Sequence, residues 1–212
     1  MIITFEGAPA VGKTTVAKRL ASEHGYVRIP EVNELFPERP SPEPEYWYCE
    51  RQLDRCQTAL KYENSILDGD PFQAVWFSWI YPNRGFADWS TSLRYFIANA
   101  HRITLPSCYV YLCIEPDERF RREKEREYAR GPTYEQFLNK WNLYADFQGP
   151  QQALFDAIKG KFPGWIHTTM TRKSGETVAE LASLAPATAP AVDMYLSWLS
   201  DWLKDNNSDD FR

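Results

Sequence analysis

The chain has 212 residues, which is long enough for one full α/β domain and too short for two ordinary ones. Hydrophobic residues make up 43% and charged residues 25%, as in ordinary globular proteins, and the net charge of −5 argues against general nucleic-acid binding. No apolar run approaches the ~20 residues of a membrane span, so we expect no membrane association.

The cysteines and the start of the chain bear on location. The four cysteines show no C-x-x-C spacing, and a reduced protein is the simplest explanation. The sequence enters an apolar run at once, so we expect no signal peptide. These patterns together predict a cytoplasmic protein.

Residues 7–14 read GAPAVGKT, a complete G-x-x-x-x-G-K-T phosphate-binding loop (P-loop). The glycines let the backbone curl so that its N–H groups surround phosphate oxygens. Lys13 reaches the β- and γ-phosphates, and the Thr14 hydroxyl binds Mg²⁺. A helix that begins at the loop adds the positive end of its dipole. The residues expected to bind the nucleotide, ATP, are Gly7, Ala10, Val11, Gly12, Lys13, Thr14 and Thr15.

The segments around the loop have the context that the motif needs. Residues 2–5 form a short apolar run typical of a buried strand. Residues 14–24 carry apolar side chains at helical spacing and end at Gly25, a good C-cap. Strand, loop and helix therefore follow one another in the order that phosphate binding requires.

The rest of the chain alternates between strands and helices. Residues 26–32 read as a strand that ends in an acidic residue, and residues 37–45 carry four prolines and form a loop. The later elements, in chain order, are a helix over 46–62, a strand over 65–68, a short aromatic helix or turn over 72–81, a helix over 88–104, a strand over 107–114, a charged helix over 117–129, a long helix over 134–158 interrupted at Gly149-Pro150, a strand over 165–169 and a helix over 176–184.

This alternation predicts an α/β fold of the three-layer P-loop NTPase type, with a mostly parallel sheet and helices on both faces. Ligands then bind at the carboxyl ends of the strands. The expected parts are a kinase domain with an arginine-rich lid helix over 1–184, an Ala/Pro linker over 185–192, a terminal amphipathic helix over 193–204 packed on the same domain, and a disordered tail over 205–212.

Aromatic residues are abundant, with 8 Trp, 12 Tyr and 12 Phe, and many lie between residues 46 and 96. Core packing explains such a cluster, and so does an acceptor pocket that stacks on a flat ring. The sequence favours neither explanation over the other.

The P-loop identifies the phosphate donor but not the reaction, since kinases, GTPases and ATPase motors share it. The chain has no Asn/Thr-Lys-x-Asp segment of the kind that GTPases use to read guanine. The short chain, the proline-rich loop and the arginine-dense helix indicate a small-molecule kinase.

Four segments resemble the deoxynucleoside kinase and thymidylate kinase group of P-loop kinases, and related small AAA-type ATP-binding proteins. They are residues 5–15, with an acidic residue before the first glycine, and residues 30–32, 67–71 and 119–130. The resemblance covers roughly residues 1–180. It implies a catalytic carboxylate after the second strand, an acidic motif after the third strand and an arginine-rich lid.

Three carboxylates are candidates for the chemistry. A hydroxyl acceptor needs a carboxylate that takes or orients its proton, and Glu31, at the end of the second expected strand, is the first choice. Asp68 and Asp70 follow an apolar strand as a Walker-B carboxylate does, and we assign Asp68 to the metal and Asp70 to the acceptor. The alternatives are a helix-capping role for Glu31 and a plain tight turn for the two aspartates.

The sequence departs from the kinase pattern at the acceptor. The arginine expected after Asp68 is missing, so we expect Arg55 or Arg84 to hold the reactive oxygen. The base-reading glutamine of deoxynucleoside kinases is not evident, and Tyr48 falls at the matching helix position. We therefore count Tyr48 among the substrate residues.

The charged helix over 117–129 is expected to act as the lid. Arg122 and Arg126 are four residues apart and could grip phosphates together, and Arg119 is a further candidate. Ion pairs between residues i and i+4 on a solvated face are the alternative.

The sequence thus predicts an ATP- and Mg²⁺-dependent P-loop kinase that transfers the γ-phosphoryl group to a small hydroxyl or phosphate acceptor. A nucleoside or nucleotide acceptor ranks first by resemblance. An O-phosphotransferase acting on an antibiotic or secondary metabolite is one alternative, and a non-catalytic nucleotide-binding switch is the other. The expected partner is the small-molecule acceptor. The sequence does not determine the oligomeric state; the resemblance allows a homodimer, because related kinases often form dimers.

Overall fold

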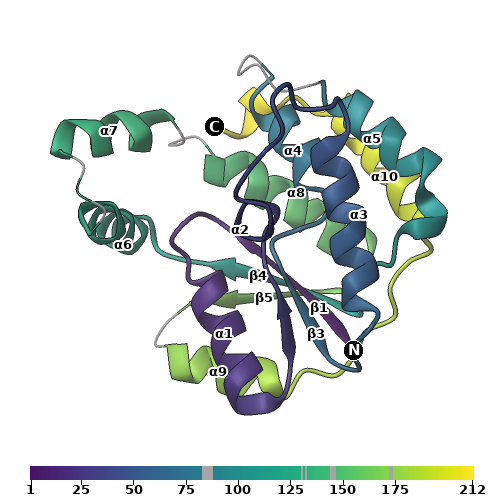
Figure 1. The fold of residues 1–212 in the computed structure, drawn as a ribbon, viewed down its shortest axis with the longest axis horizontal. Helices are drawn as coiled ribbons and strands as arrows, with labels where there is room; N and C mark the ends of the chain where they lie inside the picture. Colours follow the sequence, from purple (N-terminus) through teal and green to yellow (C-terminus); the bar gives the residue numbers. More distant parts are fainter. Residues whose placement is uncertain (83–87, 130, 132, 144–146, 172–173) are drawn as a thin grey trace.

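The computed structural model describes residues 1–82, 88–129, 131, 133–143, 147–171 and 174–212 (Figure 1). Five parallel strands form its sheet in the order β2-β3-β1-β4-β5. The strands are β1 Ile2–Gly7, β2 Val27–Ile29, β3 Ser65–Asp68, β4 Cys108–Cys113 and β5 Ile166–Met170. The expected α/β fold is confirmed, and every described strand pair is parallel.

Helices cover both faces of the sheet. The helices before β4 are α1 Lys13–His24, α2 Val32–Leu35, α3 Trp47–Ala59, α4 Gln73–Ile80, α5 Trp89–Ala98 and the 3₁₀ turn η1 Ala100–Arg102. Those after β4 are α6 Pro116–Tyr128, α7 Tyr134–Leu143, α8 Gln148–Lys161, α9 Ser174–Ala182, α10 Val192–Asp205 and the 3₁₀ turn η3 Ser208–Phe211. Helices α1 and α9 lie together on one side of the sheet, and α3, α4, α5, α8 and α10 lie on the other (Figure 1).

Side chains alternate between the two faces along β4. Val110 and Leu112 join a cluster with Leu20 of α1 and Leu181 of α9. Tyr109 and Tyr111 belong instead to the cluster on the opposite face. Such alternation is the two-residue period of a strand, and both sets are apolar because both faces of a parallel sheet are covered.

The opposite cluster contains most of the aromatic residues. The Trp165 ring meets Tyr109 and Tyr195 edge to face at centroid distances of 4.8 and 5.3 Å, and Tyr111 stacks on Phe155 at 4.7 Å. Core packing therefore accounts for most of the aromatic content. The acceptor-pocket explanation applies only to the few rings described with the site below.

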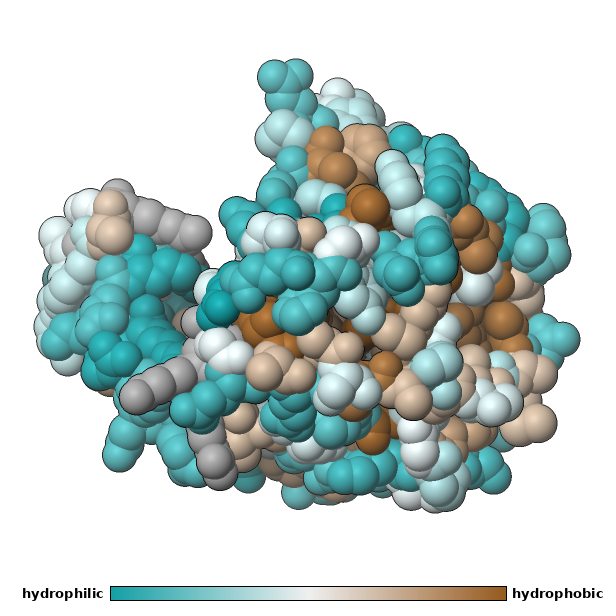
Figure 2. Space-filling model, turned by 90° about the horizontal axis from the view of Figure 1, so that it is seen from below, coloured by the Kyte–Doolittle hydropathy of each residue, from teal (hydrophilic) through white to brown (hydrophobic). Residues whose placement is uncertain are grey.

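Helices α6 and α7 extend beyond the sheet (Figure 1). They contact each other through the Phe120 ring, which meets the rings of Phe137 and Trp141 edge to face at 5.3 and 5.1 Å. On the face that Figure 2 shows, this part is a mainly hydrophilic lobe with a hollow between it and the body. We call α6 and α7 together the lid.

Three expectations about secondary structure are wrong in detail. Gly149 and Pro150 do not interrupt a helix, because both lie in the first turn of α8, where a proline leaves no helical hydrogen bond unmade. The helix expected over 88–104 stops at Ala98 and continues as η1. The strand expected over 26–32 is only β2, and Val32 already begins α2.

The end of the chain is ordered, where the sequence predicted a disordered tail. Helix α10 buries Leu196, Leu199 and Leu203 against the aromatic cluster. Beyond it, Ser208 is buried in η3, and a guanidinium nitrogen of Arg212 donates to the carbonyl of Ile80 at 2.7 Å. These contacts anchor a polar segment that composition alone marks as mobile.

No helix in the described ranges has both the length and the apolar composition that crossing a membrane requires.

Candidate active site at the carboxyl edge of the sheet

The P-loop connects the carboxyl end of β1 to the start of α1. At Gly7 the backbone has φ +143°, and a Cβ there would lie 2.3 Å from the carbonyl oxygen of Leu112 on β4. Only glycine fits this close approach of two backbones. The Lys13 ammonium donates to the Gly7 carbonyl at 2.7 Å, so its side chain folds back over the loop.

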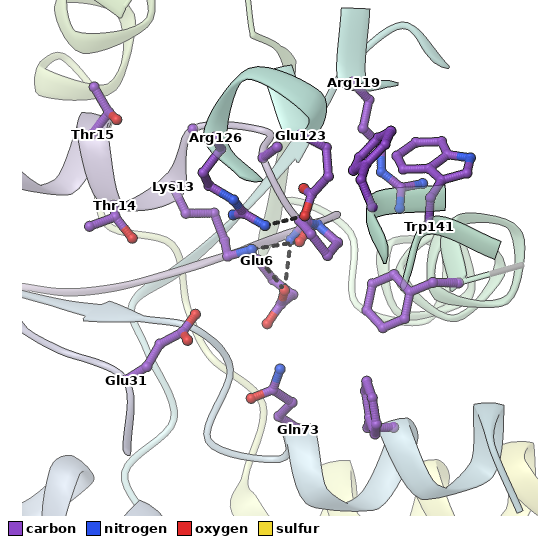
Figure 3. A pocket seen from close by; sticks show the side chains of 17 residues that line it. Glu6, Lys13, Thr14, Thr15, Glu31, Gln73, Arg119, Glu123, Arg126 and Trp141 are labelled. Carbon is purple, nitrogen blue, oxygen red and sulfur yellow. Dashed lines mark hydrogen bonds and ion pairs between the residues drawn. The ribbon is translucent and has the colours of Figure 1, made fainter. Parts of the chain in front are cut away.

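A cavity of about 550 Å³ opens over this loop (Figure 3). Of the residues predicted to bind the nucleotide, those that line it are Gly7, Ala10, Gly12, Lys13, Thr14 and Thr15. Val11 does not, because its side chain packs in the core beside α1. Lys13, Thr14 and Thr15 share one side of the cavity, and Arg119 and Trp141 stand on the opposite side (Figure 3).

Glu31 lies in the same cavity as the loop. It is separated from β2 by Pro30 and precedes the first residue of α2, and its side chain makes no capping hydrogen bond to that helix. The strand order puts the ends of β2 and β1 on either side of β3, so Glu31 and Lys13 reach the cavity from two strand ends. Gly69, after β3, lies against it: a Cβ on Gly69 would be 3.2 Å from Cγ of Glu31.

The lid contributes both charges and rings to the cavity. Arg119 places its guanidinium 4.6 Å from the centroid of the Trp141 ring. Arg126 pairs with Glu123 on the same helix, and all four of these side chains line the cavity. A cation held over an aromatic face stays charged while its apolar stem is covered.

Arg122 occupies a different position. Its Nε pairs with Glu118 at 2.7 Å, and its Nη1 donates to the carbonyl of Val11 at 3.4 Å. It therefore contacts the loop backbone without lining the cavity. The structure brings Arg126 and Arg119 into the cavity, and Arg122 beside it.

A second cavity of about 400 Å³ adjoins the first. Gln73 and Phe77 on α4 line both, so the two cavities meet at the start of this helix. The Tyr48 hydroxyl donates to Oε1 of Gln73 at 3.0 Å, and burial raises the pKa of Tyr48 to about 12. Tyr48 therefore remains a neutral hydrogen-bonding group at physiological pH.

The rim of the second cavity is charged. Arg39, from the proline-rich loop, stacks over the rings of Trp47 and Tyr48 at 5.6 and 5.4 Å and pairs with Glu43 at 3.1 Å. Glu43 and Glu45 also line this cavity.

Arg55, which was predicted to hold the acceptor, lies outside both cavities. Its side chain is buried and donates to three backbone carbonyls: Pro30 at 2.7 Å, Asp68 at 2.7 Å and Gly69 at 3.2 Å. It therefore ties the end of β2 to the end of β3. The guanidinium also donates to Oε1 of Gln52. Because Arg55 makes these bonds within the core and lines neither cavity, they correct the prediction that it holds the acceptor. Arg84 lies outside the described residues.

Asp68, the last residue of β3, and Asp70, two residues beyond it, are also buried and line neither cavity. Asp70 accepts from the Tyr109 hydroxyl at 2.9 Å and from the Trp76 indole at 2.7 Å, so its carboxylate is engaged within the core. Burial raises its pKa. Asp70 is thus a structural carboxylate, and the predicted acceptor contact is wrong.

Asp68 is bound on one side only. Oδ2 accepts from Nε of Arg28 at 2.8 Å, while Oδ1 is buried with no hydrogen-bond partner in the described part of the chain. Such an orphaned oxygen is what a metal ion or its bound water satisfies. The Thr14 hydroxyl and the Glu31 carboxylate face the cavity itself. Hard oxygens of this kind fit Mg²⁺, which takes one or two protein ligands besides phosphates and water.

Several residues that line the cavities were not predicted, and Gln73 and Glu6 are two of them. Gln73 follows a Pro71-Phe72 turn, and nothing in the spacing marks it as facing a cavity. Glu6 lies beneath Lys13, with 3.8 Å between the ammonium nitrogen and Oε1. The acidic residue before the first glycine and the alternation along β1, whose Ile3 and Phe5 face the other side, were available signals for Glu6.

No protein-family model matches the sequence, and no curated protein matches it. The solved structures that are similar to it over most of its length include the following two. A deoxyadenosine kinase from M. mycoides, with the products dCMP and a flexible dCDP bound, has a TM-score of 0.49 at 15% identity over 97% of this chain and 100% of its own. The YorR protein from Bacillus subtilis, in complex with phosphorylated GDP, has a TM-score of 0.47 at 18% identity over 85% of this chain and 93% of its own.

The order of the five parallel strands and the P-loop between β1 and α1 define the fold as that of a P-loop nucleotide-binding protein.

Proposed function

We propose that this chain is a small-molecule kinase that transfers the γ-phosphoryl group of ATP to an acceptor, with Mg²⁺. The observation that carries the proposal is the pair of adjoining cavities: the first contains the P-loop and Glu31, and the second opens from it at Gln73 and Phe77. A donor site with a carboxylate beside it and a separate space for a second molecule is what phosphoryl transfer needs.

The P-loop and the lid would neutralise the donor. Lys13 exchanges its bond with the Gly7 carbonyl for the β- and γ-phosphates, while the backbone N–H groups at the start of α1 bind the same oxygens. Arg119 and Arg126 of the lid line the same cavity and offer further positive charge. Thr14 would bind Mg²⁺ in the cavity, and Asp68, which does not line the cavity, would reach the ion through a bound water. The ion would supply further charge neutralisation at the transferred group.

Glu31 would act on the acceptor. Its carboxylate lines the donor cavity and makes no capping bond that would occupy it. A carboxylate so placed can orient an acceptor hydroxyl and receive its proton as the phosphoryl group arrives.

The second cavity would bind the body of the acceptor. The Phe77 ring offers a face on which a planar group can stack, and Gln73, fixed by Tyr48, can read polar atoms on its edge. A nucleoside or nucleotide combines such a ring with the hydroxyl or phosphate that accepts the phosphoryl group, and we propose this class first.

The charge at the rim supports a second candidate. Glu43 and Glu45 line the second cavity, and its one arginine among the described lining residues, Arg39, is already paired with Glu43. An acidic rim suits an acceptor that carries amines. A hydroxylated, amine-bearing secondary metabolite, an antibiotic among them, is therefore the second class.

A screen of acceptors tests the proposal. ATP and Mg²⁺ are incubated with nucleosides, nucleoside monophosphates and aminated hydroxyl compounds, and products are identified by mass. We expect one class to gain a single phosphate, and the class identifies the acceptor. The Lys13→Ala variant is the control for contaminating kinases. Tight ATP binding with no acceptor phosphorylated would instead support the non-catalytic switch.

A further inference from the structure

Glu6 is a buried carboxylate that lines the donor cavity. It is the sixth residue of the chain and lies near the end of β1, where Thr4 and Glu6 face away from the cluster that Ile3 and Phe5 join. Its side chain is 2% exposed. A charge-bearing group in such a place needs partners, and each of its partners belongs to a different part of the site.

The carboxylate is bonded on both oxygens. Oε1 accepts from the Gly7 backbone N–H at 2.8 Å and from the Gln151 side chain of α8 at 3.2 Å, and the Lys13 ammonium lies 3.8 Å from it. Oε2 accepts from the Asp70 backbone N–H at 2.9 Å. Glu6 thus joins the P-loop, the P-loop lysine, α8 and the turn after β3.

The turn that Glu6 holds also supports Glu31. Gly69 precedes Asp70, has φ +91°, and lies so close to Glu31 that a Cβ would stand 3.2 Å from Cγ and 3.3 Å from Oε1. A shift of the turn would therefore move the surface against which the Glu31 carboxylate rests. The buried Glu6 side chain therefore contacts both Lys13, at the donor site, and the Gly69-Asp70 turn, which supports the proposed base Glu31.

We infer that Glu6 is a positioning residue that couples the two halves of the site: it holds Lys13 in place before the donor binds and, through the Gly69-Asp70 turn, fixes Glu31. The part of this inference that concerns Glu31 rests on the proposed function. The part that concerns Lys13 requires only that the chain binds a nucleotide.

The coupling has a definite sign. The negative charge of Glu6 attracts Lys13 and repels donor phosphates, so removing the charge frees Lys13 and tightens nucleotide binding. The same removal weakens the bond that the carboxylate receives from the Asp70 backbone N–H, so it loosens the turn that supports Glu31 and slows transfer. Tighter binding with slower transfer is not what simple loss of structure produces.

The charge of Glu6 changes near neutral pH. Burial raises its pKa to about 7; Lys13 opposes this rise, the Asp70 carboxylate adds to it, and the backbone N–H groups of Asp70 and Gly7 oppose it. The remaining facing groups are the amide of Gln151 on α8 and the phenol of Tyr111 on β4, which is neutral at this pH. Nucleotide affinity should therefore weaken as pH rises through about 7.

The Glu6→Gln variant tests the donor half without an acceptor. We measure the Kd of ATP by calorimetry between pH 6 and 8.5 in the wild type and in the variant. We expect the variant to bind about three- to tenfold more tightly at pH 8, with the difference vanishing at pH 6. Equal affinities at every pH, or uniformly weaker binding with an unchanged pH profile, would overturn the inference.

Gln151→Met keeps the charge of Glu6 and serves as a second variant if Glu6→Gln does not fold. It removes a donor to the charged carboxylate while keeping the side-chain volume. The midpoint of the pH dependence of Kd should then move to higher pH. An unmoved midpoint would show that another group titrates, and would contradict the assignment.

The acceptor identified by the screen tests the catalytic half. Glu6→Gln should lower kcat by tenfold or more while KM for ATP falls or stays the same. A rise in KM for ATP with unchanged kcat would contradict the coupling. If no acceptor is phosphorylated by the wild type, the proposed function fails, and the calorimetric result still decides the role of Glu6 toward Lys13.

Discussion

The Tyr48 hydroxyl donates a hydrogen bond to Oε1 of Gln73 across 3.0 Å, and this bond joins α3 to α4 at the place where the two cavities meet. With its oxygen engaged, Gln73 keeps its amide N–H groups to offer to a ligand. The pair therefore gives a fixed, directional donor between the phosphate loop and the acceptor space.

Replacing Gln73 should weaken binding of the acceptor without affecting binding of ATP. In Gln73→Met, which keeps the volume, KM for the acceptor should rise about three- to tenfold, the effect of one hydrogen bond. KM for ATP should stay within about twofold. Tyr48→Phe, which frees Gln73 to turn, should raise KM for the acceptor by a smaller factor. The double variant should lose less free energy of acceptor binding than the two single variants together. Additive effects would contradict a role for the pair as a unit.

Lys13→Ala should abolish transfer and leave the fold intact. Within the described residues its ammonium contacts only loop carbonyls and Glu6, so its loss removes charge neutralisation at the phosphates rather than core packing. We expect kcat to fall on the order of 10²–10³-fold. Circular dichroism and the melting temperature should match the wild type. A variant that keeps a tenth of the activity would exclude Lys13 from the assigned role.

Glu31→Gln should slow the chemical step more than it weakens ATP binding. Loss of a positioned base lowers kcat on the order of 10²–10⁴-fold, whereas the donor contacts remain. Glu34→Gln is the matched control, because it removes the same charge from α2 at a side chain that pairs with Arg28 and lies outside both cavities. Near-wild-type kcat in Glu31→Gln would show that another group serves as the base.

Gly69→Ala and Gly25→Ala separate backbone strain from loss of the site. Both glycines have positive φ, +91° and +74°, so each alanine should cost roughly 1–2 kcal/mol of stability. Only the Cβ at Gly69 meets a neighbour, Glu31, whereas nothing lies within 4 Å at Gly25. We therefore expect both variants to melt at lower temperature and only Gly69→Ala to lose kcat. Equal kcat in the two would contradict the support of Glu31 by this turn.

Glu6 should make stability depend on pH. Its pKa rises from an ordinary value of 4.5 to about 7 on burial, so the unfolded state loses the proton first as pH rises. The native state is then penalised by up to roughly 3 kcal/mol between about pH 4.5 and 7, with no further change above that range. Denaturant unfolding of the wild type and of Glu6→Gln, compared at pH 5 and pH 8, should show this difference. Identical pH profiles would contradict a buried, titrating Glu6.

Several parts of the site follow from the sequence because they depend on local order. The P-loop could be predicted since its glycines, lysine and threonines are adjacent in the chain, and β1 and α1 flank it as expected. Glu31 could be placed because a residue at the carboxyl end of a parallel strand comes to the ligand edge of the sheet. Both inferences need no knowledge of distant contacts.

The acceptor side could not be predicted in the same way. Arg55 lies on the expected helix, yet three backbone carbonyls from two strand ends converge on it and remove it from the cavity. Asp70 is likewise engaged by Trp76 on α4 and by Tyr109, which lies 39 residues further along the chain. Such convergence is a property of tertiary packing, and neither spacing nor residue type reveals it.

Following the γ-phosphoryl group of labelled ATP through a single turnover tests the central claim most directly. Wild-type protein in excess over [γ-³²P]ATP is mixed with Mg²⁺ and the acceptor panel, and the label is located after separation. We expect the wild type to place the label on an acceptor, and Lys13→Ala to do so on the order of 10²–10³-fold more slowly. Label that stays on ATP, or leaves only as inorganic phosphate whatever acceptor is present, would contradict a kinase built across these two cavities.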